Sequence, residues 1–268
     1  MRGRLLAIGG SDSGGGAGIQ ADIKTALALG AYAGSAITAV TVQDTRAVYV
    51  VHRIAPKLVA DQITRFLDDT GADAVKCGML VDGVMIEAVS SALAGSQVPL
   101  VLDPVIIASS GRALLKAGAI SALLEHLLPR ATLVTPNLPE ASQLTGISEH
   151  SPAFRERAAE RLLRGGASAV LIKGGHGSDA VLHDRLFTQA GDVSFSHARI
   201  DTRHTHGTGC TLAAAIAVGL AQGLALSKAA ERGIAYVQAA LATAPGLGGG
   251  AGPLNHAAWM GEGSQQPP

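Results

Sequence analysis

The chain has 268 residues, with 21 Lys and Arg balanced by 21 Asp and Glu, so its formal net charge is zero. This balance excludes a strongly basic surface for nucleic acid or an anionic membrane, and the expected partners are therefore small molecules. Hydrophobic residues make up 47% and charged residues 16% of the chain, so much of it is expected to be buried, and its length is compatible with one large α/β domain.

The first apolar run, residues 5–8, is too short for the apolar region of a secretory signal peptide. Later apolar stretches are interrupted by Gly, Lys or Asp before about 18 residues, which argues against a membrane-spanning helix. The two cysteines, Cys77 and Cys210, form neither a Cys-x-x-Cys pair nor a disulfide framework. A reducing compartment, the cytoplasm, is therefore expected.

Short apolar runs alternate along the chain with segments of helical spacing, a pattern typical of a parallel sheet whose strands are joined by helices. We predict strands near residues 4–8, 35–42, 48–51, 74–77, 100–102, 132–134, 169–173 and 180–182. We predict helices near residues 19–29, 56–69, 81–93, 113–127, 151–164, 210–222 and 227–243. The predicted fold is a doubly wound, three-layer αβα sandwich with a mostly parallel central sheet, and a flexible tail is expected from about residue 246. Ligands of such sheets bind beyond the carboxyl ends of the strands.

Residues 9–18 follow the first predicted strand and include six glycines. Because glycine permits positive φ and close backbone approach, we interpret the segment as a loop against a flat polar ligand rather than as a flexible surface turn. Residues 16–21 also fit the G-x-G-x-x-A dinucleotide pattern, which keeps an NAD(P) oxidoreductase as a rival. The fit is poor, because seven residues separate the end of the strand at Ile8 from Gly16. A Walker A loop is excluded, since no Gly-Lys-Ser/Thr occurs.

Two polar residues near the next strand are candidates for ligand contacts. Asp22 lies about one turn into the first predicted helix, where its carboxylate serves either a ligand hydroxyl or the helix amino terminus. Gln43 follows a long apolar run, and its amide offers one acceptor and two donors. These groups suit a ring nitrogen beside an amino group, as in an aminopyrimidine.

Three later residues indicate a polyphosphate and its metal ion. Asn137 and Glu140 are three residues apart at a strand-to-helix turn, a spacing that fits oxygen ligands near Mg²⁺ and equally fits a helix capping box. Lys173 ends a predicted strand and precedes two glycines. Its ammonium is either a partner for phosphate or a solvated charge at the end of the strand.

The segment His206-Gly207-Thr208-Gly209-Cys210 leads into a helix of small residues. The free N–H groups and the positive dipole end of such a helix hold anions, including the oxygens of a phosphoryl group in transfer. Cys210 at this position is expected to have a lowered thiol pKa and to accept a proton from an attacking alcohol. The alternative is ordinary: Thr208 caps the helix and Cys210 is a small buried apolar residue.

Seven segments carry a resemblance to a known family: residues 9–25, 38–43, 76–80, 102–105, 135–140, 173–176 and 205–211. Together they resemble the hydroxymethylpyrimidine/phosphomethylpyrimidine kinases, a thiamine-biosynthesis branch of the ribokinase-like superfamily. The resemblance extends from about Leu5 to Leu241. It implies a ribokinase-like αβα sandwich, usually found as a homodimer.

The resemblance also implies a reaction and roles for individual residues. Mg-ATP would phosphorylate 4-amino-5-hydroxymethyl-2-methylpyrimidine and then its monophosphate. The residues placed at the pyrimidine are Gly10, Asp22, Gln43, Met79 and Val105. Those placed at the nucleotide phosphates and Mg²⁺ are Lys173, Thr208, Asn137 and Glu140, while Gly207, Thr208, Gly209 and Cys210 form the anion hole. Sugar kinases of the superfamily carry Asp at the position of Cys210, which leaves the identity of the base open.

Three alternatives to this reaction stay open at the level of sequence. The chain catalyses only one of the two phosphorylations, or it acts on pyridoxal or pyridoxine, whose ring also bears a hydroxymethyl group. A protein that binds the pyrimidine without transferring phosphate is a further possibility. The residues expected to bind the nucleotide, Asn137, Glu140, Lys173 and 207–210, argue against this last alternative, because a protein that only binds the pyrimidine does not need them.

Overall fold

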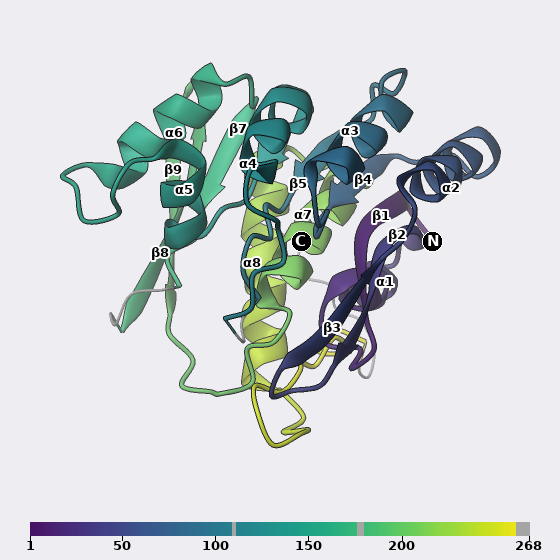
Figure 1. Ribbon diagram of the computed structural model, residues 1–268. Helices are drawn as coiled ribbons and strands as arrows, with labels where there is room; N and C mark the ends of the chain where they lie inside the picture. Colours follow the sequence, from purple (N-terminus) through teal and green to yellow (C-terminus); the bar gives the residue numbers. More distant parts are fainter. Residues whose placement is uncertain (109–110, 176–179, 261–268) are drawn as a thin grey trace.

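The computed structural model describes residues 1–108, 111–175 and 180–260, which form one sheet with helices on both faces (Figure 1). The sheet has nine strands in the order β3-β2-β1-β4-β5-β6-β7-β8-β9. Their bounds are β1 (Arg4–Asp12), β2 (Tyr32–Gln43), β3 (Val48–Arg53), β4 (Ala74–Cys77), β5 (Leu100–Leu102), β6 (Leu133–Val134), β7 (Ala169–Ile172), β8 (Val181–Thr188) and β9 (Gly191–Ala198).

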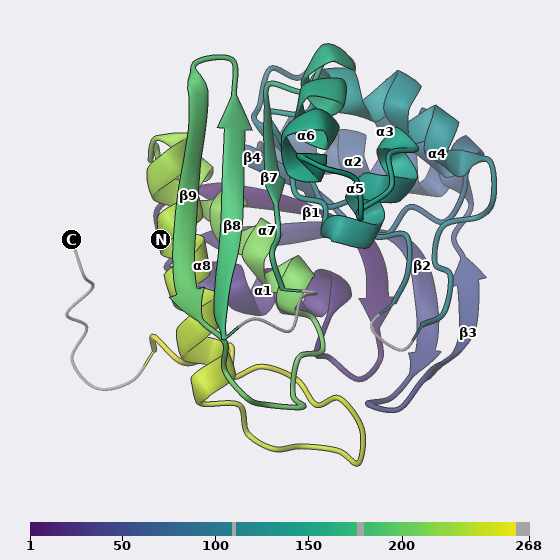
Figure 2. The ribbon, with the colours of Figure 1, turned by 90° about the vertical axis from the view of Figure 1, so that its left-hand side faces the viewer.

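The middle of the sheet is parallel and its margins are antiparallel. Strands β2, β1, β4, β5, β6 and β7 pair in parallel. At one margin β3 runs antiparallel to β2, and at the other β8 and β9 form an antiparallel hairpin against β7 (Figure 2). The parallel strands therefore end at one common edge, where residues from distant parts of the chain meet.

Helices cover the sheet in two layers, which confirms the predicted αβα sandwich. One face carries α2 (Pro56–Asp69), α3 (Gly83–Ala92), α4 (Ala119–Ala122), α5 (Leu138–Thr145) and α6 (Phe154–Arg164), with a π-helical turn η1 (Leu123–Leu127) and a 3-10 turn η2 (Leu128–Arg130). The other face carries α1 (Gly18–Ala28), α7 (Thr208–Ala221) and α8 (Leu226–Ala242).

The strands are apolar on both sides because both faces of the sheet are buried. Neighbouring residues of a strand enter different cores: Leu5 packs with α7 and α8, whereas Leu6 packs with α2 and α3. Helix α7 is buried along most of its length, and its alanines allow α8 and the sheet to approach closely. This close packing fixes the position of the amino terminus of α7.

Some elements differ from the sequence prediction. Strand β1 continues to Asp12, four residues past the predicted end, with a register shift at Gly9 and Gly10. The helix predicted near residues 113–127 begins only at Ala119. Residues 113–118 are not helical, and Gly118 has a positive φ of 84° just before α4. The sequence prediction also lacked α5 and β9, which are short or mostly exposed and so give a weak periodic signal.

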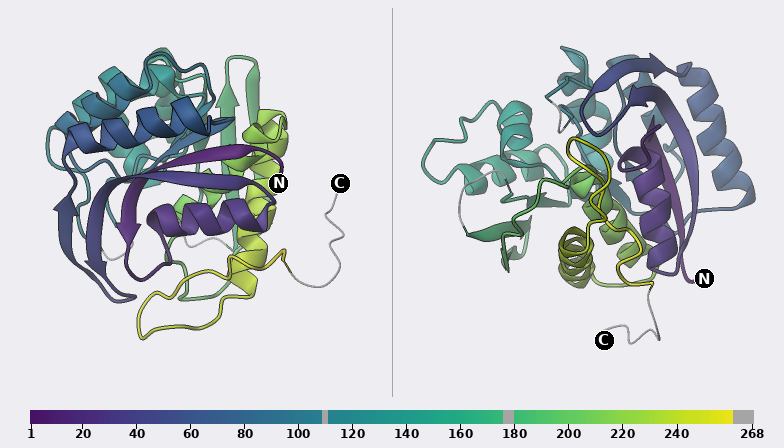
Figure 3. Two further views of the ribbon diagram at one scale, coloured as in Figure 1. Left: turned by 90° about the vertical axis from the view of Figure 1, so that its right-hand side faces the viewer. Right: turned by 90° about the horizontal axis from the view of Figure 1, so that it is seen from below.

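Part of the tail that was expected to be flexible from about residue 246 is hydrogen-bonded to the rest of the fold. The segment of residues 246–256 crosses the edge of the sheet beside the turn between β2 and β3 (Figure 3). The N–H of Gly250 donates to Thr45 Oγ1 at 3.1 Å, and Gly252 O accepts from the N–H of His206 at 3.1 Å. Residues 261–268, which also belong to the predicted tail, and His176 of the 173–176 motif lie outside the described residues.

Candidate active site

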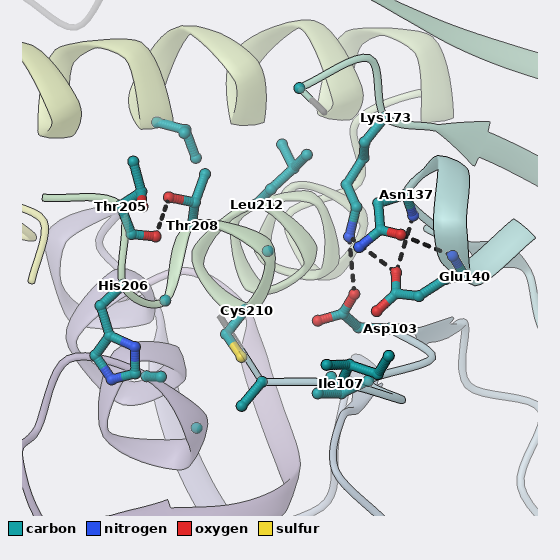
Figure 4. A pocket seen from close by; sticks show the side chains of 18 of the residues that line it. Asp103, Ile107, Asn137, Glu140, Lys173, Thr205, His206, Thr208, Cys210 and Leu212 are labelled. Atoms are coloured by element: carbon teal, nitrogen blue, oxygen red, sulfur yellow. Dashed lines mark hydrogen bonds and ion pairs between the residues drawn. The ribbon is translucent and has the colours of Figure 1, made fainter. Parts of the chain in front are cut away.

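A cavity of about 630 Å³ opens along the carboxyl edge of the parallel strands (Figure 4). Its walls come from the ends of β1, β2, β4, β5 and β7, from the start of α7 and from the side of α8. Nearly every candidate residue predicted from the sequence lines it, namely Gly10, Gln43, Met79, Val105, Asn137, Glu140, Lys173, Gly207, Thr208, Gly209 and Cys210. Asp22 is the exception, since it is fully buried behind the wall.

The amino terminus of α7 faces the cavity without a side-chain cap. Its N-cap residue is Gly207, at φ 85°, where a Cβ atom would lie 1.9 Å from the carbonyl oxygen of Gly16. Only glycine fits that position. The alternative that Thr208 caps the helix is wrong, because its hydroxyl instead donates to Thr205 O at 2.7 Å. The first-turn N–H groups thus face the cavity as an anion site.

Cys210 lies in the first turn of α7, but its environment differs from the expectation. Burial raises the pKa of the thiol to about 11, although Lys76 acts in the opposite direction. The lowered pKa predicted from the helix position is therefore wrong, because desolvation outweighs the helix dipole and the nearby ammonium. The thiol is therefore protonated at neutral pH when no substrate is bound.

Asp22 and Lys76 form a buried ion pair beneath the cavity. Lys76 Nζ lies 2.9 Å from Asp22 Oδ2, and the two side chains are 1% and 0% exposed. Burial raises the pKa of Asp22 to about 6 despite Lys76. Burial alone would lower the pKa of Lys76, but Asp22, Cys210 and Asp103 outweigh it and raise that pKa. Both groups are therefore ionised at neutral pH, and Lys76, not Asp22, reaches the cavity.

At the other end of the cavity, Lys173 joins two acidic side chains (Figure 4). Its Nζ lies 3.2 Å from Asp103 Oδ1 and 3.9 Å from Glu140 Oε2. Burial would lower the pKa of Lys173, but the two carboxylates raise it above its usual value. A charged ammonium beside the Gly174 turn suits the phosphates of a nucleotide.

Asn137 and Glu140 make the capping box that their spacing allowed. Asn137 Oδ1 accepts from the N–H of Glu140 at 2.8 Å, and Glu140 Oε2 accepts from the N–H of Asn137 at 2.9 Å. Burial raises the pKa of Glu140 to about 7, with Lys173 acting against the shift. Asn137 and Glu140 therefore cap α5 and also line the cavity.

The donor set here fits Mg²⁺ that arrives with a nucleotide. Among the residues that the structure describes, no cluster of three or more His, Cys, Asp or Glu side chains forms a metal cage. Mg²⁺ in nucleotide sites is usually bound by one or two carboxylates together with phosphates and water. Asp103 and Glu140, which both contact Lys173, are oxygen donors of that kind.

The glycine-rich loop folds around the carboxylate of Asp12. Asp12 accepts hydrogen bonds from the N–H groups of Gly14, Gly16 and Ala17 at 2.8–3.0 Å. These N–H groups point at Asp12 and are not available to a dinucleotide pyrophosphate. A Cβ atom at Gly18 would lie 2.2 Å from Gly10 O, so the glycine serves close backbone packing. The loop therefore does not support the NAD(P) reading of residues 16–21.

Asp12 also links this loop to Gln43 through His206. His206 Nε2 lies 2.8 Å from Asp12 Oδ2 and 2.9 Å from Gln43 Nε2. Burial alone would raise the pKa of Asp12, but the hydrogen bonds from His206 and the loop N–H groups hold it below its usual value. Gln43 thus lies next to His206 on the wall of the cavity, although one ring nitrogen cannot both donate to Asp12 and accept from the amide of Gln43.

Sequence reasoning did not assign roles to four residues that the structure places on the cavity wall: Asp12, Lys76, Asp103 and His206. Asp103 directly follows β5, so the rule that ligands bind at strand ends could have found it. His206 precedes the predicted anion hole. Lys76 begins one of the segments that carry the resemblance, but a lysine inside a four-residue apolar strand does not show which side of the sheet it faces.

A family model described as "Phosphomethylpyrimidine kinase" matches residues 12–255. The chain belongs to this family. The "Hydroxymethylpyrimidine/phosphomethylpyrimidine kinase" of Streptomyces coelicolor is 45% identical over 260 residues, 96% of each chain. The "Thiamine biosynthesis bifunctional protein ThiED" of Geobacter sulfurreducens is 47% identical over 258 residues, which cover 95% of this chain and 52% of that protein, so the chain spans about half its length.

Solved structures agree with the family. A phosphomethylpyrimidine kinase from Clostridium difficile 630 is 37% identical, covers 88% of this chain and 97% of its own, and has a TM-score of 0.78. An ADP complex of Bacillus subtilis pyridoxal kinase is 33% identical, covers 97% and 99%, and has a TM-score of 0.89. The predicted fold class and the prediction of a phosphotransferase of thiamine biosynthesis are confirmed. No helix in the described ranges is both long and apolar enough to cross a bilayer.

Proposed function

We propose that the chain uses Mg-ATP to phosphorylate the hydroxymethyl group of 4-amino-5-hydroxymethyl-2-methylpyrimidine, and then phosphorylates the resulting monophosphate. The observation that carries the proposal is the uncapped amino terminus of α7, which lies between two chemically different ends of one cavity. Both steps need an anion site between an acceptor and a nucleotide. Family membership supports the same reaction.

The end of the cavity next to β1 and β2 suits a small aminopyrimidine. Gln43 offers an amide for the ring nitrogen and the amino group, and this amide lies beside His206. Gly10 lets Met79 pack closely at this end, because a Cβ atom there would lie 2.8 Å from the sulfur of Met79. Met79 and Val105 provide apolar walls.

The end next to β7 suits the nucleotide. Lys173 binds phosphate oxygens, and the two carboxylates beside it, Asp103 and Glu140, would hold Mg²⁺ directly or through water. When bound there, the ion would supply positive charge that offsets the negative charge of the phosphates. The N–H groups of Gly209 and Cys210 then contact the oxygens of the phosphoryl group as it moves toward the acceptor.

The proton of the attacking hydroxyl passes to Cys210 in this proposal. The bond from the acceptor oxygen to the γ-phosphorus forms while the bond to the β-γ bridging oxygen breaks, and ADP leaves. Because burial raises the pKa of the thiol to about 11, only a small fraction is thiolate at neutral pH. A weak base suffices, because proton transfer comes late when the acceptor bond forms late.

The chain is further proposed to act as a homodimer in the cytoplasm. Val40, Val42 and Val50 on the outer side of the β2–β3 hairpin are 43%, 57% and 50% exposed. Thr41 and Gln43, which alternate with them along β2, line the cavity instead. An apolar face of this kind suits a second copy of the chain.

A phosphate-transfer assay tests the proposal, with Mg-ATP and either the hydroxymethylpyrimidine or its monophosphate, and with products resolved by mass. Formation of the diphosphate from both substrates is the expected result. A product that stops at the monophosphate would restrict the activity to the first step. Absence of any phosphorylated pyrimidine would refute the proposal.

Phosphorylation of pyridoxal is the second candidate. The observation in its favour is the similarity to pyridoxal kinases, including a Staphylococcus aureus complex with AMP-PCP and pyridoxal that is 30% identical with a TM-score of 0.87. The same assay with pyridoxal separates the two functions. A phosphorylated product from pyridoxal but from neither pyrimidine would favour vitamin B6 salvage.

A further inference from the structure

The buried pair of Lys76 and Asp22 has no part in the mechanism described so far. Lys76 is on β4 and Asp22 is on α1, and Nζ lies 2.9 Å from Oδ2. The second oxygen of Asp22, Oδ1, is buried without a hydrogen-bond partner among the described residues. The carboxylate therefore holds the ammonium from one side only.

Stability does not explain the pair. Two charges lose most of their hydration when both side chains are at most 1% exposed, and apolar residues of similar size are often as stabilising in such places. The surrounding core on this face of the sheet is apolar, with Leu5, Ala26 and Ala74 among its residues. A buried charge beside a substrate cavity is more typical of function.

The ammonium lies at the floor of the cavity. The side chain extends toward the carboxyl end of β4, because a Cβ atom at Gly78 would lie 2.8 Å from Lys76 Nζ. Its charge acts on the thiol of Cys210, which puts the ammonium near the first turn of α7. Lys173, a half-buried lysine on the wall, is held at the nucleotide end by Asp103 and Glu140.

We propose that Lys76 binds the substrate oxygen that receives the phosphoryl group and that it favours the pyrimidine monophosphate over the alcohol. An ammonium has three N–H donors, of which the contact with Asp22 uses one. In the first step the acceptor is a neutral hydroxyl, and in the second it is an oxygen of a phosphate. The charged acceptor gains more from the ammonium. This inference rests on the proposed function.

The first test is the double variant Lys76→Met/Asp22→Asn, which replaces the pair with neutral side chains of similar size and leaves no unpaired buried charge. Calorimetric titration without ATP measures binding separately from chemistry. Loss of a hydrogen bond between charged groups predicts a Kd for the monophosphate about 100-fold higher and a Kd for the alcohol less than about tenfold higher. The control is Lys57→Met/Asp61→Asn, which removes an exposed pair on α2, and it should match the wild type.

A second test displaces the ammonium without removing its charge. In Gly78→Ala the new methyl group would meet Lys76 Nζ at 2.8 Å, while the next nearest atoms are 3.6 and 3.8 Å away. The end of a flexible side chain can move, so the fold tolerates the change. We expect Gly78→Ala to weaken monophosphate binding by about tenfold and alcohol binding by less.

The outcomes separate this inference from the proposed function. In one outcome, the wild type binds and phosphorylates both pyrimidines, and the double variant and Gly78→Ala bind the monophosphate as tightly as the wild type. Only the role of Lys76 is then overturned. Equal losses for the alcohol and the monophosphate overturn it too, since they indicate a general distortion. A wild type that binds neither pyrimidine overturns the proposed function and this inference with it.

Discussion

Cys210 shows how two effects on one thiol compete. Its place in the first turn of α7 favours the thiolate through the helix dipole, and Lys76 favours it as well. Burial favours the neutral thiol and is the largest effect, so the pKa is raised to about 11. The reactivity of this residue should therefore depend strongly on pH.

The pH dependence of turnover tests Cys210 as the base. Below its pKa the thiolate fraction grows about tenfold per pH unit, so log kcat should rise with a slope near 1 from about pH 7 to 10. Cys210→Ala should lower kcat by at least about 100-fold and remove the slope, with little change in KM for the pyrimidine. Steady-state kinetics of both proteins across this pH range measure the effect. An unchanged kcat or a slope that persists in Cys210→Ala would exclude the thiolate as base and leave the anion hole intact.

Gln43 is predicted to serve pyrimidine recognition alone. Gln43→Ala should raise the Kd for the pyrimidine by about 10- to 100-fold, because loss of the amide leaves a ring nitrogen and an amino group of the ligand without hydrogen-bond partners. The Kd for ATP should change by less than about twofold, and calorimetry measures both. Gln189→Ala, at the exposed turn between β8 and β9, is the control. Equal losses for both ligands would mean that Gln43 supports the fold and not the substrate.

At single positions, the sequence predicted backbone-driven features better than buried charges. The helix start after the Gly207 turn and the capping box of Asn137 and Glu140 depend on local geometry, which short motifs report. The pair of Asp22 and Lys76 spans 54 positions, so no local pattern indicates it. The predicted direction of the Cys210 pKa shift was wrong for a similar reason, because the burial that raises this pKa depends on the whole fold.

Among the elements, the segment of residues 246–256 connects two parts of the site with the core. It contacts the turn between β2 and β3 at Thr45 and the start of α7 at His206. Its end is anchored in the core, where His256 O accepts from the hydroxyl of Tyr236 at 2.6 Å and His256 Nε2 lies 3.1 Å from Thr211 Oγ1. The segment thereby supports the position of His206 against Asp12.

A single methyl group should disturb this segment. In Gly250→Ala the new Cβ would lie 2.1 Å from the backbone oxygen of Thr45, which cannot move as easily as a side chain. We expect the free energy of unfolding to fall by about 1–3 kcal/mol and pyrimidine binding to weaken, because His206 loses its support. Denaturant unfolding and calorimetry measure these effects.

The matched control for Gly250→Ala is Gly95→Ala, where no atom lies within 4 Å of the new methyl group. Its free energy of unfolding should change by less than about 0.5 kcal/mol. A Gly250→Ala protein with the stability and the pyrimidine affinity of this control would show that the segment does not support the site.

The elements that the sequence predicted well are those with strong burial patterns. Strands β4 and β5 and helix α2 begin and end where predicted, since β5 is wholly apolar, β4 is apolar apart from Lys76, and α2 has a clear amphipathic face. Strand β9 was missed because its side chains alternate between exposed and half-buried, with few apolar residues. Helix α5 has only eight residues, and Pro139 in its first turn resembles a loop signal.

For the whole molecule, the exposed valines of the β2–β3 hairpin test the proposed homodimer. Val42→Asp/Val50→Asp places charges on a face that a second copy would bury, so the molar mass should fall from dimer to monomer. Size-exclusion chromatography with light scattering gives the molar mass. Val193→Asp on β9, where the side chain is 47% exposed, is the control and should stay dimeric. A hairpin variant that remains dimeric would place the interface elsewhere, and a monomeric wild type would refute the homodimer.

The contact between Asp12 and His206 joins positions 194 residues apart. Strand β1 leaves the ribosome before α7 and the segment after α8 do, because it precedes them in the chain. Contacts so distant in sequence form slowly, because the intervening chain must first become compact. Much of the sheet can thus assemble on an unfinished chain, while the cavity is completed last. Ligands that bind in it select fully folded molecules and delay their degradation, so supply of substrate would raise the amount of enzyme in the cell.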